Sequence, residues 1–539
     1  MKMNTFNRIR VGAIIVLFSM AIQAQKAPET YINPILTGFH PDPSICRVGD
    51  DYYMVNSSFE WFPGIPIYKS RDLVNWKLIG YGLTRTNQVE LPEGLPDSRG
   101  IYAVSIRYND GIFYLITTCV KCKGNFYITA TDPAGEWSDP VWLGSKGIDP
   151  SLFWDDDGRC YYTGHGNITK ENPWPQKNGA WMQELDLQQK KLVGKKVQLT
   201  HGHATNARWT EGPHIYKIEG KYILLVAEGG TGFHHCVSMH HSDSLWGPYV
   251  PFHSNPVLSH RQFGMKYPVH SVGHADIIQT QQGEWWMVTL GKRLVDGYSM
   301  LARETFLTPM MFEDQEGILT PVVNPGFGKL PVEAKRPGLP WTPVEQQPTR
   351  DEFNGNKLAL EWNFLRTPYE KWHIQKDGKL GLRLRPEVVD SFTNPSLIAR
   401  RIQHHKWSAS TQISFSSKKM NEHAGMILYR SSENHFKFVK GKDEIVIIKT
   451  EKGISKKVSK VDYAAKDLVM KVEINNLEVK FYYGTDLDNL IQLGDNLDIR
   501  LLSDELSGGF NGPFVGMYAS SNGLSSKSIA TFDWFEYNP

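Results

Sequence analysis

The chain has 539 residues, too many for one hydrophobic core, so at least two domains are expected. Its 59 basic and 57 acidic side chains nearly balance and form no basic run, which argues against a nucleic-acid partner. The 16 Trp and 23 Tyr residues are compatible both with a strand-rich fold and with stacking on sugars.

The N-terminus predicts a signal peptide over residues 1–24. Basic residues precede a short apolar run over 11–22, and the small residue Ala24 follows it. The run is too short for a comfortable membrane span. We therefore expect the protein to be secreted across the inner membrane, to the periplasm or the outside, with no membrane association after the signal is cleaved.

A hairpin motif recurs five times over residues 31–335. Each copy has a leading residue, a short apolar strand, a turn and a returning strand rich in aromatic residues. The copies start near residues 42, 103, 149, 211 and 274, so they repeat about every 46 to 63 residues. Helical periodicity is almost absent. Four-stranded units at this period predict a five-bladed β-propeller.

The leading residues of the copies should converge, because the innermost strand of each propeller blade lines the central axis. They are Asp42, Ala103, Asp149, Glu211 and His274. Any one carboxylate at a strand start could simply cap a turn. Three in the same repeat register favour a functional site, because gathering like charges is unfavourable unless chemistry or a ligand requires it.

The last third of the chain has a different pattern. Residues 336–349 are rich in proline and form the best linker candidate. Residues 350–539 then show short strands without helices, such as 379–384 and 445–448, and no copy of the hairpin motif. This pattern predicts a second all-β domain, a β-sandwich.

The three carboxylates suit hydrolysis of a glycosidic bond, in which one carboxylate activates water and a protonated carboxyl group donates to the leaving oxygen. Asp42 lies among prolines at a rigid strand start, so it is the predicted general base. Glu211 has the longer side chain and is the predicted general acid. Asp149 is then the third carboxylate, which raises the pKa of the acid by repulsion of like charge.

Several motifs resemble the signatures of glycoside hydrolase family 43. They are 39–44 (FHPDPS), 147–151 (GIDPS), 210–214 (TEGPH), 273–276 (GHAD) and 303–305 (RET). The resemblance covers nearly the whole mature chain, because many β-xylosidases and α-L-arabinofuranosidases of that family carry a C-terminal concanavalin-like β-sandwich, a jelly roll. Val104 departs from the proline that family members often have at that position.

The resemblance implies an exo-acting, inverting glycosidase. Such an enzyme would release terminal α-L-arabinofuranosyl or β-D-xylosyl residues, or both, from plant hemicellulose glycans such as xylan, and would need no cofactor for its chemistry. It assigns Asp42 as the base, Glu211 as the acid, and Asp149 as pKa modulator and orienter. The expected partner is an oligosaccharide or polysaccharide. The motifs are compatible with either sugar and with any oligomeric state.

The resemblance also suggests residues that contact the substrate. Arg303 matches an arginine that contacts sugar hydroxyls, although a surface ion pair is the alternative. His274 matches an axial histidine, and Phe514 matches a sandwich residue that closes the pocket. Trp61 could offer a stacking face. For His274, Phe514 and Trp61 the alternative is ordinary core packing.

The resemblance suggests one metal site as well. Asp351 and Asp533 stand near the two ends of the sandwich segment, where similar sandwiches share a structural calcium ion. Carboxylate oxygens are the ligands that calcium prefers.

Two alternatives to this function remain open. Fructan hydrolases combine the same two domains but retain configuration, and they carry an Asn before the first Asp and a Glu-Cys-Pro motif at the acid. This chain has Pro41 and Glu211-Gly212-Pro213 at these places. The second alternative is a non-catalytic carbohydrate-binding propeller, which would tolerate loss of the carboxylates.

Overall fold

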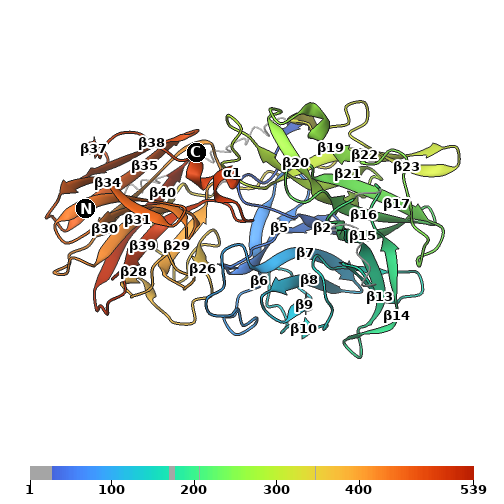
Figure 1. Ribbon diagram of the computed structural model, residues 1–539, viewed down its shortest axis with the longest axis horizontal. Helices are drawn as coiled ribbons and strands as arrows, with labels where there is room; N and C mark the ends of the chain where they lie inside the picture. The colour runs from blue at the N-terminus through green and yellow to red at the C-terminus, as the bar shows by residue number, and fades with distance from the viewer. Residues whose placement is uncertain (1–26, 169–176, 205–206, 346) are drawn as a thin grey trace, which may run out of the picture.

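The structure is a computed structural model that describes residues 27–168, 177–204, 207–345 and 347–539. The signal peptide expected over residues 1–24 lies outside this range. Figure 1 shows two β-rich bodies side by side, one in blue to yellow and one in orange to red. Within the described ranges, no helix is long and apolar enough to cross a membrane.

The first body is the predicted five-bladed propeller. Each blade is an antiparallel sheet whose strands follow one another along the chain. Blades 1 and 2 consist of β2 (Ser44–Val48), β3 (Asp51–Val55), β5 (Gly64–Ser70) and β6 (Lys77–Leu83), then β7 (Gly100–Asn109), β8 (Ile112–Val120), β9 (Gly124–Ala130) and β10 (Val141–Trp142). Blade 3 consists of β11 (Ser151–Trp154), β12 (Cys160–His165), β13 (Ala180–Asp186) and β14 (Lys191–Thr200).

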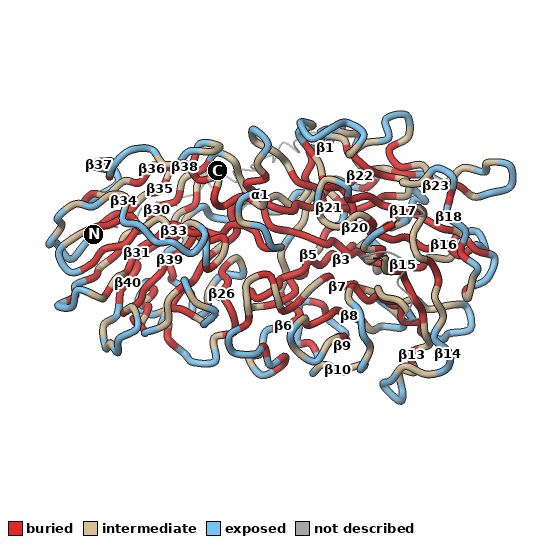
Figure 2. Tube along the Cα trace, viewed as in Figure 1, coloured by how far each residue is buried: buried red, intermediate tan, exposed pale blue. Residues whose placement is uncertain are grey.

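Blades 4 and 5 complete the wheel. They consist of β15 (Glu211–Ile218), β16 (Lys221–Glu228), β17 (Cys236–Ser242) and β18 (Val250–Pro251), with β19 (Leu258–Ser259) also on β17, then β20 (Val269–Gln279), β21 (Trp285–Arg293), β22 (Glu304–Gln315) and β23 (Ile318–Val323). The five repeated hairpins are the first two strands of the five blades. Alternating apolar residues face the neighbouring blade, and Figure 2 shows the inner strands as mostly buried.

Each of the five blades takes its strands from one continuous stretch of the chain. Strand β1 (Thr30–Ile32) pairs instead with β24 (Glu333–Lys335), which follows the last blade. Asn33 then donates from Nδ2 to the Leu307 carbonyl at 2.7 Å, and its Oδ1 accepts the Leu307 N–H at 2.9 Å. These contacts join the start of the chain to blade 5.

The second body is the predicted β-sandwich. One sheet has the order β27 (His373–Lys376), β28 (Lys379–Arg383), β40 (Ile529–Asn538), β30 (Lys406–Ser414), β35 (Asp467–Asn475), β36 (Glu478–Gly484) and β37 (Leu490–Gln492), with β25 (Arg350–Asp351) on β40 and β38 (Leu497–Asp498) on β36. The other has the order β34 (Ile454–Asp462), β33 (Glu444–Glu451), β32 (Asn434–Lys440), β31 (His423–Ser431), β39 (Phe514–Ser520), β29 (Ser396–Arg401), β26 (Asn363–Leu365) and β4 (Trp61–Phe62). The described helical turns are η1 (Arg261–Phe263), η2 (Arg500–Leu502) and α1 (Asp504–Ser507).

Strand β4 belongs to the propeller segment by sequence but completes a sheet of the sandwich. Trp61 pairs with Leu365 and Phe62 with Phe364. The Trp61 ring is 1% exposed and stacks on Phe514, with ring centroids 3.7 Å apart. Backbone hydrogen bonds and an aromatic stack therefore hold the sandwich against blade 1.

Candidate active site

Three of the leading residues lie in the left-handed region of backbone conformation. The φ angles are 53° at Asp42, 53° at Asp149 and 48° at His274. A non-glycine residue held in this region costs about 1–3 kcal/mol, and such strain tends to persist at functional sites. Asp42 and Asp149 stand just before β2 and β11, and His274 lies at an irregularity within β20. The same strain in three blades indicates that these side chains must point in one particular direction.

Blade 4 reaches the same arrangement with a shift of one residue. Here Gly212, with φ 59°, has the left-handed conformation, and the carboxylate is on the residue before it, Glu211. A Cβ atom on Gly212 would lie 3.1 Å from Cε1 of His274, closer than most real Cβ contacts. Glycine is therefore required here both by its conformation and by the approach of the histidine ring.

Serine hydroxyls join neighbouring inner strands below the leading residues. Ser105 Oγ donates to the Pro150 carbonyl at 2.9 Å, and Ser151 Oγ donates to the Pro213 carbonyl at 2.5 Å. These bonds link blade 2 to blade 3 and blade 3 to blade 4. The serine of the Asp-Pro-Ser motif thus acts between blades, whereas its aspartate acts at the axis.

Asp276 is the polar centre of the axis. Its fully buried carboxylate accepts hydrogen bonds from Ser44 Oγ at 2.7 Å, Tyr216 Oη at 2.5 Å and Arg107 Nη1 at 2.8 Å. Burial alone would raise its pKa, but Arg107 and His214 hold the pKa well below the usual range. An ionised carboxylate from blade 5 therefore ties blades 1, 2 and 4 together beneath the site.

Asp42 has the surroundings of an ionised carboxylate. Arg303 Nη1 lies 2.6 Å from its Oδ1, Ser57 Oγ donates to its Oδ2 at 2.6 Å, and His274 Nδ1 is 3.9 Å from Oδ1. Burial would raise the pKa of Asp42, but the charge of Arg303, the neighbouring His274 ring and the Ser57 hydrogen bond together lower it. Asp42 therefore stays charged although it is buried.

Asp149 and Glu211 have the opposite tendency. Burial raises the pKa of Glu211 well above the usual range, and the charges of Asp149 and Asp42 raise it further, whereas Arg303 opposes them. Burial also raises the pKa of Asp149, with His274 acting against the shift and Asp42 adding to it. The three carboxylates therefore act on one another, with one held ionised and one held protonated.

Phe510, a residue of the sandwich, lies beside this cluster and contacts Arg303. Its carbonyl accepts a hydrogen bond from Arg303 Nη2 at 3.0 Å. Its ring stacks on Phe59 at 6.0 Å and meets Tyr102 edge to face at 5.8 Å. The partly exposed rings of Tyr102 and Phe510 are aromatic faces beside the carboxylates.

The loop that carries Phe510 is anchored to blades 1 and 2. The Phe510 N–H donates to Ser98 Oγ at 2.8 Å, and the Ser98 N–H donates to Glu60 Oε2 at 3.0 Å. Asn511 Nδ2 donates to the other oxygen of Glu60. Burial raises the pKa of Glu60 to about 8, and the charge of Asp97 adds to this shift. The propeller therefore positions the loop through a buried carboxyl group.

Helix α1 fixes the other end of the same loop. Asp504 pairs with Lys292 and with Arg430, each at 2.8 Å, and so joins blade 5 to β31. The Ser299 N–H and Oγ both donate to Glu505 at 2.8 Å. Residues between the two anchors are thus held over the end of blade 5.

Two of the predicted substrate contacts lie in the core instead. Phe514 is 0% exposed and packs between Trp61 and Phe39. Tyr429 also meets the Trp61 ring edge to face, with ring centroids 6.0 Å apart. The docking of the sandwich on blade 1 encloses both rings, so the placement of Phe514 and Trp61 corresponds to the core-packing alternative. Phe510, four residues earlier in the same glycine-rich segment, has the position that was expected for Phe514.

The two aspartates proposed for calcium each have a protein partner for the carboxylate. Asp351 accepts the Phe353 N–H and the Trp362 Nε1–H, both at 2.8 Å. Asp533 pairs with Lys379 Nζ at 2.8 Å. In the residues that the structure describes, no group of three or more His, Cys, Asp or Glu side chains is placed to hold a metal ion. Asp533 lies in β40 and Asp351 in β25, which pairs with β40, and N–H and ammonium groups contact the two carboxylates.

His235 is a site neighbour that the sequence motifs did not reveal. Its buried ring donates from Nδ1 to the Ser271 carbonyl at 3.0 Å, while Nε2 has no hydrogen-bond partner among the residues that the structure describes. Burial lowers the pKa of His235 to about 3, and the field of Asp42 acts on it. A Cβ atom on Gly273 would lie 2.5 Å from this ring. His235 directly precedes β17, the third strand of blade 4, which is not part of the repeated hairpin motif.

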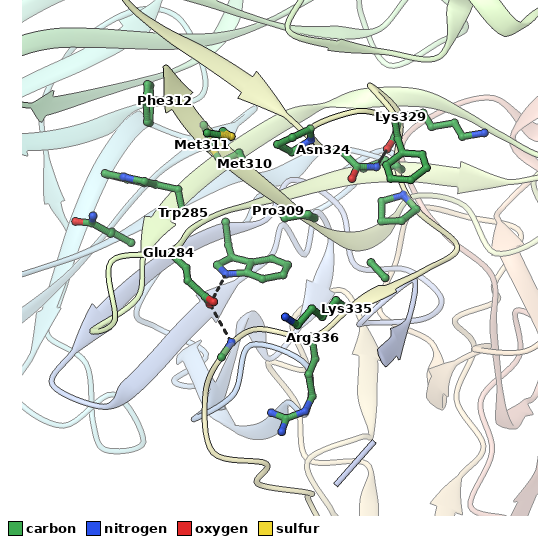
Figure 3. A pocket seen from close by; sticks show the side chains of 18 of the residues that line it. Glu284, Trp285, Pro309, Met310, Met311, Phe312, Asn324, Lys329, Lys335 and Arg336 are labelled. Atoms are coloured by element: carbon green, nitrogen blue, oxygen red, sulfur yellow. Dashed lines mark hydrogen bonds between the residues drawn. The ribbon is translucent and has the colours of Figure 1, made fainter. Parts of the chain in front are cut away.

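A cavity of about 1280 Å³ lies away from this cluster. It lies on blade 5, where Trp285, Trp286, Met310 and Phe312 form part of its wall (Figure 3). Glu284 at its edge accepts hydrogen bonds from Trp286 Nε1 at 3.3 Å and from a backbone N–H at 2.9 Å. This cavity adjoins the turns that end the inner strands, at the opposite end from their leading residues.

Opposed protonation states in one buried group of carboxylates are what cleavage of a glycosidic bond requires, so the fold and the site together define a glycoside hydrolase. A family model described as glycosyl hydrolases family 43 matches residues 31–317. A second, described as beta xylosidase C-terminal concanavalin A-like domain, matches residues 350–538. The chain belongs to glycoside hydrolase family 43, as its motifs predicted.

Individual relatives agree over nearly the full length. A xylosidase/arabinosidase of Butyrivibrio fibrisolvens is 40% identical over 93% of this chain and 98% of the relative. The non-reducing end alpha-L-arabinofuranosidase BoGH43B of Bacteroides ovatus is 38% identical over 98% of this chain and 99% of the relative. The crystal structure of xylan beta-1,4-xylosidase from Bacillus halodurans has a TM-score of 0.88, with 35% identity over 94% of this chain and 100% of that chain.

Proposed function

We propose that this family 43 enzyme is an exo-acting, inverting glycosidase that releases terminal α-L-arabinofuranosyl or β-D-xylosyl residues, or both, from plant hemicellulose glycans and their oligosaccharides. The names of its full-length relatives, which are xylosidases and arabinosidases, support this choice of sugars. The single observation that carries the reaction is the pair of opposite pKa shifts at Asp42 and Glu211 within one buried cluster.

In the proposed reaction, Asp42 acts as the general base. Its ionised carboxylate accepts a proton from a water molecule while the water oxygen bonds to the anomeric carbon. Glu211 acts as the general acid and gives its proton to the glycosidic oxygen as the bond from that oxygen to the anomeric carbon breaks. Asp149 keeps Glu211 protonated through its charge and orients the sugar. Since water attacks directly, the configuration at the anomeric carbon inverts.

Arg303 and the loop of Phe510 support exo action. Arg303 holds Asp42 in place and also binds the Phe510 carbonyl, so the sandwich loop lies directly over the base. A loop fixed by Glu60, Ser98 and Asp504 on that side leaves room for the end of a glycan better than for its middle. We assign Phe510 and Tyr102 as the aromatic faces for the terminal sugar.

The proposal includes secretion to the periplasm or the cell exterior, which the basic start and the apolar run over 11–22 support. Cell fractionation with and without residues 1–24 tests it. An enzyme found only in the cytoplasm would contradict it.

The reaction is tested with aryl α-L-arabinofuranoside and aryl β-D-xyloside, by comparing kcat/KM for the two and by following the first-formed anomer with NMR. We expect the product to appear first with inverted configuration. Product with retained configuration would exclude Asp42 as a base and favour a covalent intermediate. Activity unchanged in Glu211→Gln on both substrates would exclude the proposed acid.

A further inference from the structure

A second pocket lies on the same face of the propeller as the three carboxylates, between blades 2 and 3. Its volume is about 460 Å³, within the range of sites for small ligands. Its polar wall consists of Ser145, Lys146, Asn167, Trp181, Gln183 and Lys196, and we call it the blade 2–3 pocket. It is separate from the large cavity on blade 5.

The pocket adjoins Asp149. Its wall includes Gly147, two residues before Asp149, and the His165 N–H binds the Ile148 carbonyl at 3.1 Å. Ser145 Oγ donates to the Tyr162 hydroxyl at 3.2 Å. The Tyr162 phenol is buried and lies close enough to Asp149 for the charge of that carboxylate to help raise its pKa.

The charge in the pocket is positive. Two lysines line it and no carboxylate does. Both lysines are exposed, and neither Lys146 nor Lys196 has an acidic partner within salt-bridge distance in the part of the chain that the structure describes. Unpaired ammonium groups in a recess attract an anionic ligand.

Trp181 fixes the position of one of these charges. Lys196 Nζ lies 3.3 Å from the centre of the Trp181 ring, and the Tyr162 ring packs 4.9 Å from the same indole. The indole is 1% exposed. It therefore holds the ammonium group by a cation–π interaction and is not free to stack on a neutral sugar.

We propose that the blade 2–3 pocket binds a uronic acid, the carboxylate-bearing sugar that branches from the leaving-group part of an acidic glycan. Lys196 and Lys146 pair with the carboxylate, and Ser145, Asn167 and Gln183 bind the hydroxyls. The inference deepens the proposed function, because the terminal sugar is bound at Asp42 and Glu211 while the acidic branch occupies the neighbouring pocket. The enzyme then prefers acidic to neutral substrates.

Binding is measured by calorimetry on the full-length Glu211→Gln variant, which keeps the ligand intact. The probes are a xylo-oligosaccharide with one glucuronosyl branch next to its terminal xylosyl residue and the unbranched oligosaccharide of equal length. We expect the acidic probe to bind about tenfold more tightly than the neutral one. The difference should shrink as the salt concentration rises, because the ammonium groups are exposed.

The residue next to Lys196 provides the matched control. Lys195 lies on the same strand, but its ammonium group is 5.3 Å from the Trp246 ring and outside the pocket wall. Lys196→Gln should abolish the preference for the acidic probe, whereas Lys195→Gln should keep it. Lys146→Gln is the second variant, in case Lys196→Gln is unstable, and should weaken the preference in the same direction.

Equal affinity for the two probes, or an equal loss in Lys195→Gln and Lys196→Gln, would overturn the inference. Inorganic phosphate that displaces the acidic probe as well as free glucuronate does would show a general anion site and would also overturn it. Because binding is read without turnover, a lack of activity on aryl glycosides would sink the proposed function and leave this result standing.

Discussion

Arg303 and Asp42 form a buried ion pair at 2.6 Å, with the two side chains 4% and 6% exposed. The arginine directly precedes β22 and the aspartate lies just before β2, 261 positions apart in the chain. A buried pair contributes little to stability by itself, because removing both charges from water is costly. Its consequence here is chemical, since it sets the protonation state of the group nearest to the proposed water.

Replacing Arg303 should shift the acidic limb of the activity profile. The folded-state pKa of Asp42 is held below its usual value by Arg303, so Asp42 is ionised down to acidic pH. Without the guanidinium the pKa rises, and the base becomes protonated at a higher pH. In Arg303→Ala we expect kcat/KM to fall by about a hundredfold and the acidic limb to move to higher pH. Arg303→Lys should restore part of the shift, since it restores the charge. An acidic limb at the same pH in all three proteins would contradict the role.

Replacing Glu211 should remove the alkaline limb. The pKa of Glu211 is raised by burial and by Asp149, so its proton is lost only well above the usual pH for glutamate. Glu211→Gln should lower kcat by about 10²–10⁴-fold and lose less activity on substrates with good leaving groups. Asp132→Asn, in an exposed turn of blade 2, is the control and should match the unchanged enzyme. An alkaline limb that persists in Glu211→Gln would identify a different acid.

The two phenylalanines of the sandwich segment should respond in opposite ways. Phe514→Ala empties a stacked site in the core and should reduce the free energy of unfolding by about 3–5 kcal/mol. Phe510→Ala removes a partly exposed ring beside Arg303 and should lower kcat/KM by about tenfold with a small change in stability. Denaturant unfolding and kinetics on an aryl glycoside separate the effects. If Phe514→Ala lost activity while keeping its stability, the assignment would be reversed.

Gly212 should be sensitive to substitution for two reasons, of which Gly220 shares only one. Gly212→Ala places an L side chain in the left-handed region, at about 1–2 kcal/mol, and pushes a Cβ atom toward His274. Gly220→Ala, in the next turn of the same blade, has φ 78° and no atom within 4 Å of the new Cβ. Both variants should lose similar stability, but only Gly212→Ala should lose kcat, because it displaces Glu211. Equal activities would show that the histidine ring moves aside.

Local features of the chain determined much of this protein. The period of the hairpins predicted five blades, since each hairpin is a self-contained unit of turn and strand chemistry. The repeated Asp-Pro-Ser segments predicted that Asp42 and Asp149 stand at the axis, because each segment leads into the innermost strand of its blade. Glu211 was predicted from the fourth copy of the hairpin motif. That Gly212, and not Glu211, takes the left-handed conformation in this blade is visible only in the backbone angles.

Only the tertiary structure determined which residues meet where the sandwich packs against the propeller. The sequence offers Phe510 and Phe514 in one glycine-rich segment, and nothing local distinguishes the ring in the core from the ring at the site. Strand β4 pairs with β26, which lies about 300 residues later in the chain, and no repeat in the sequence predicts this pairing. Asp533 meets Lys379, and His235 meets Ser271, for the same reason. Hydrophobic burial and backbone pairing between distant segments choose these neighbours, and the pKa values of the site follow from that choice.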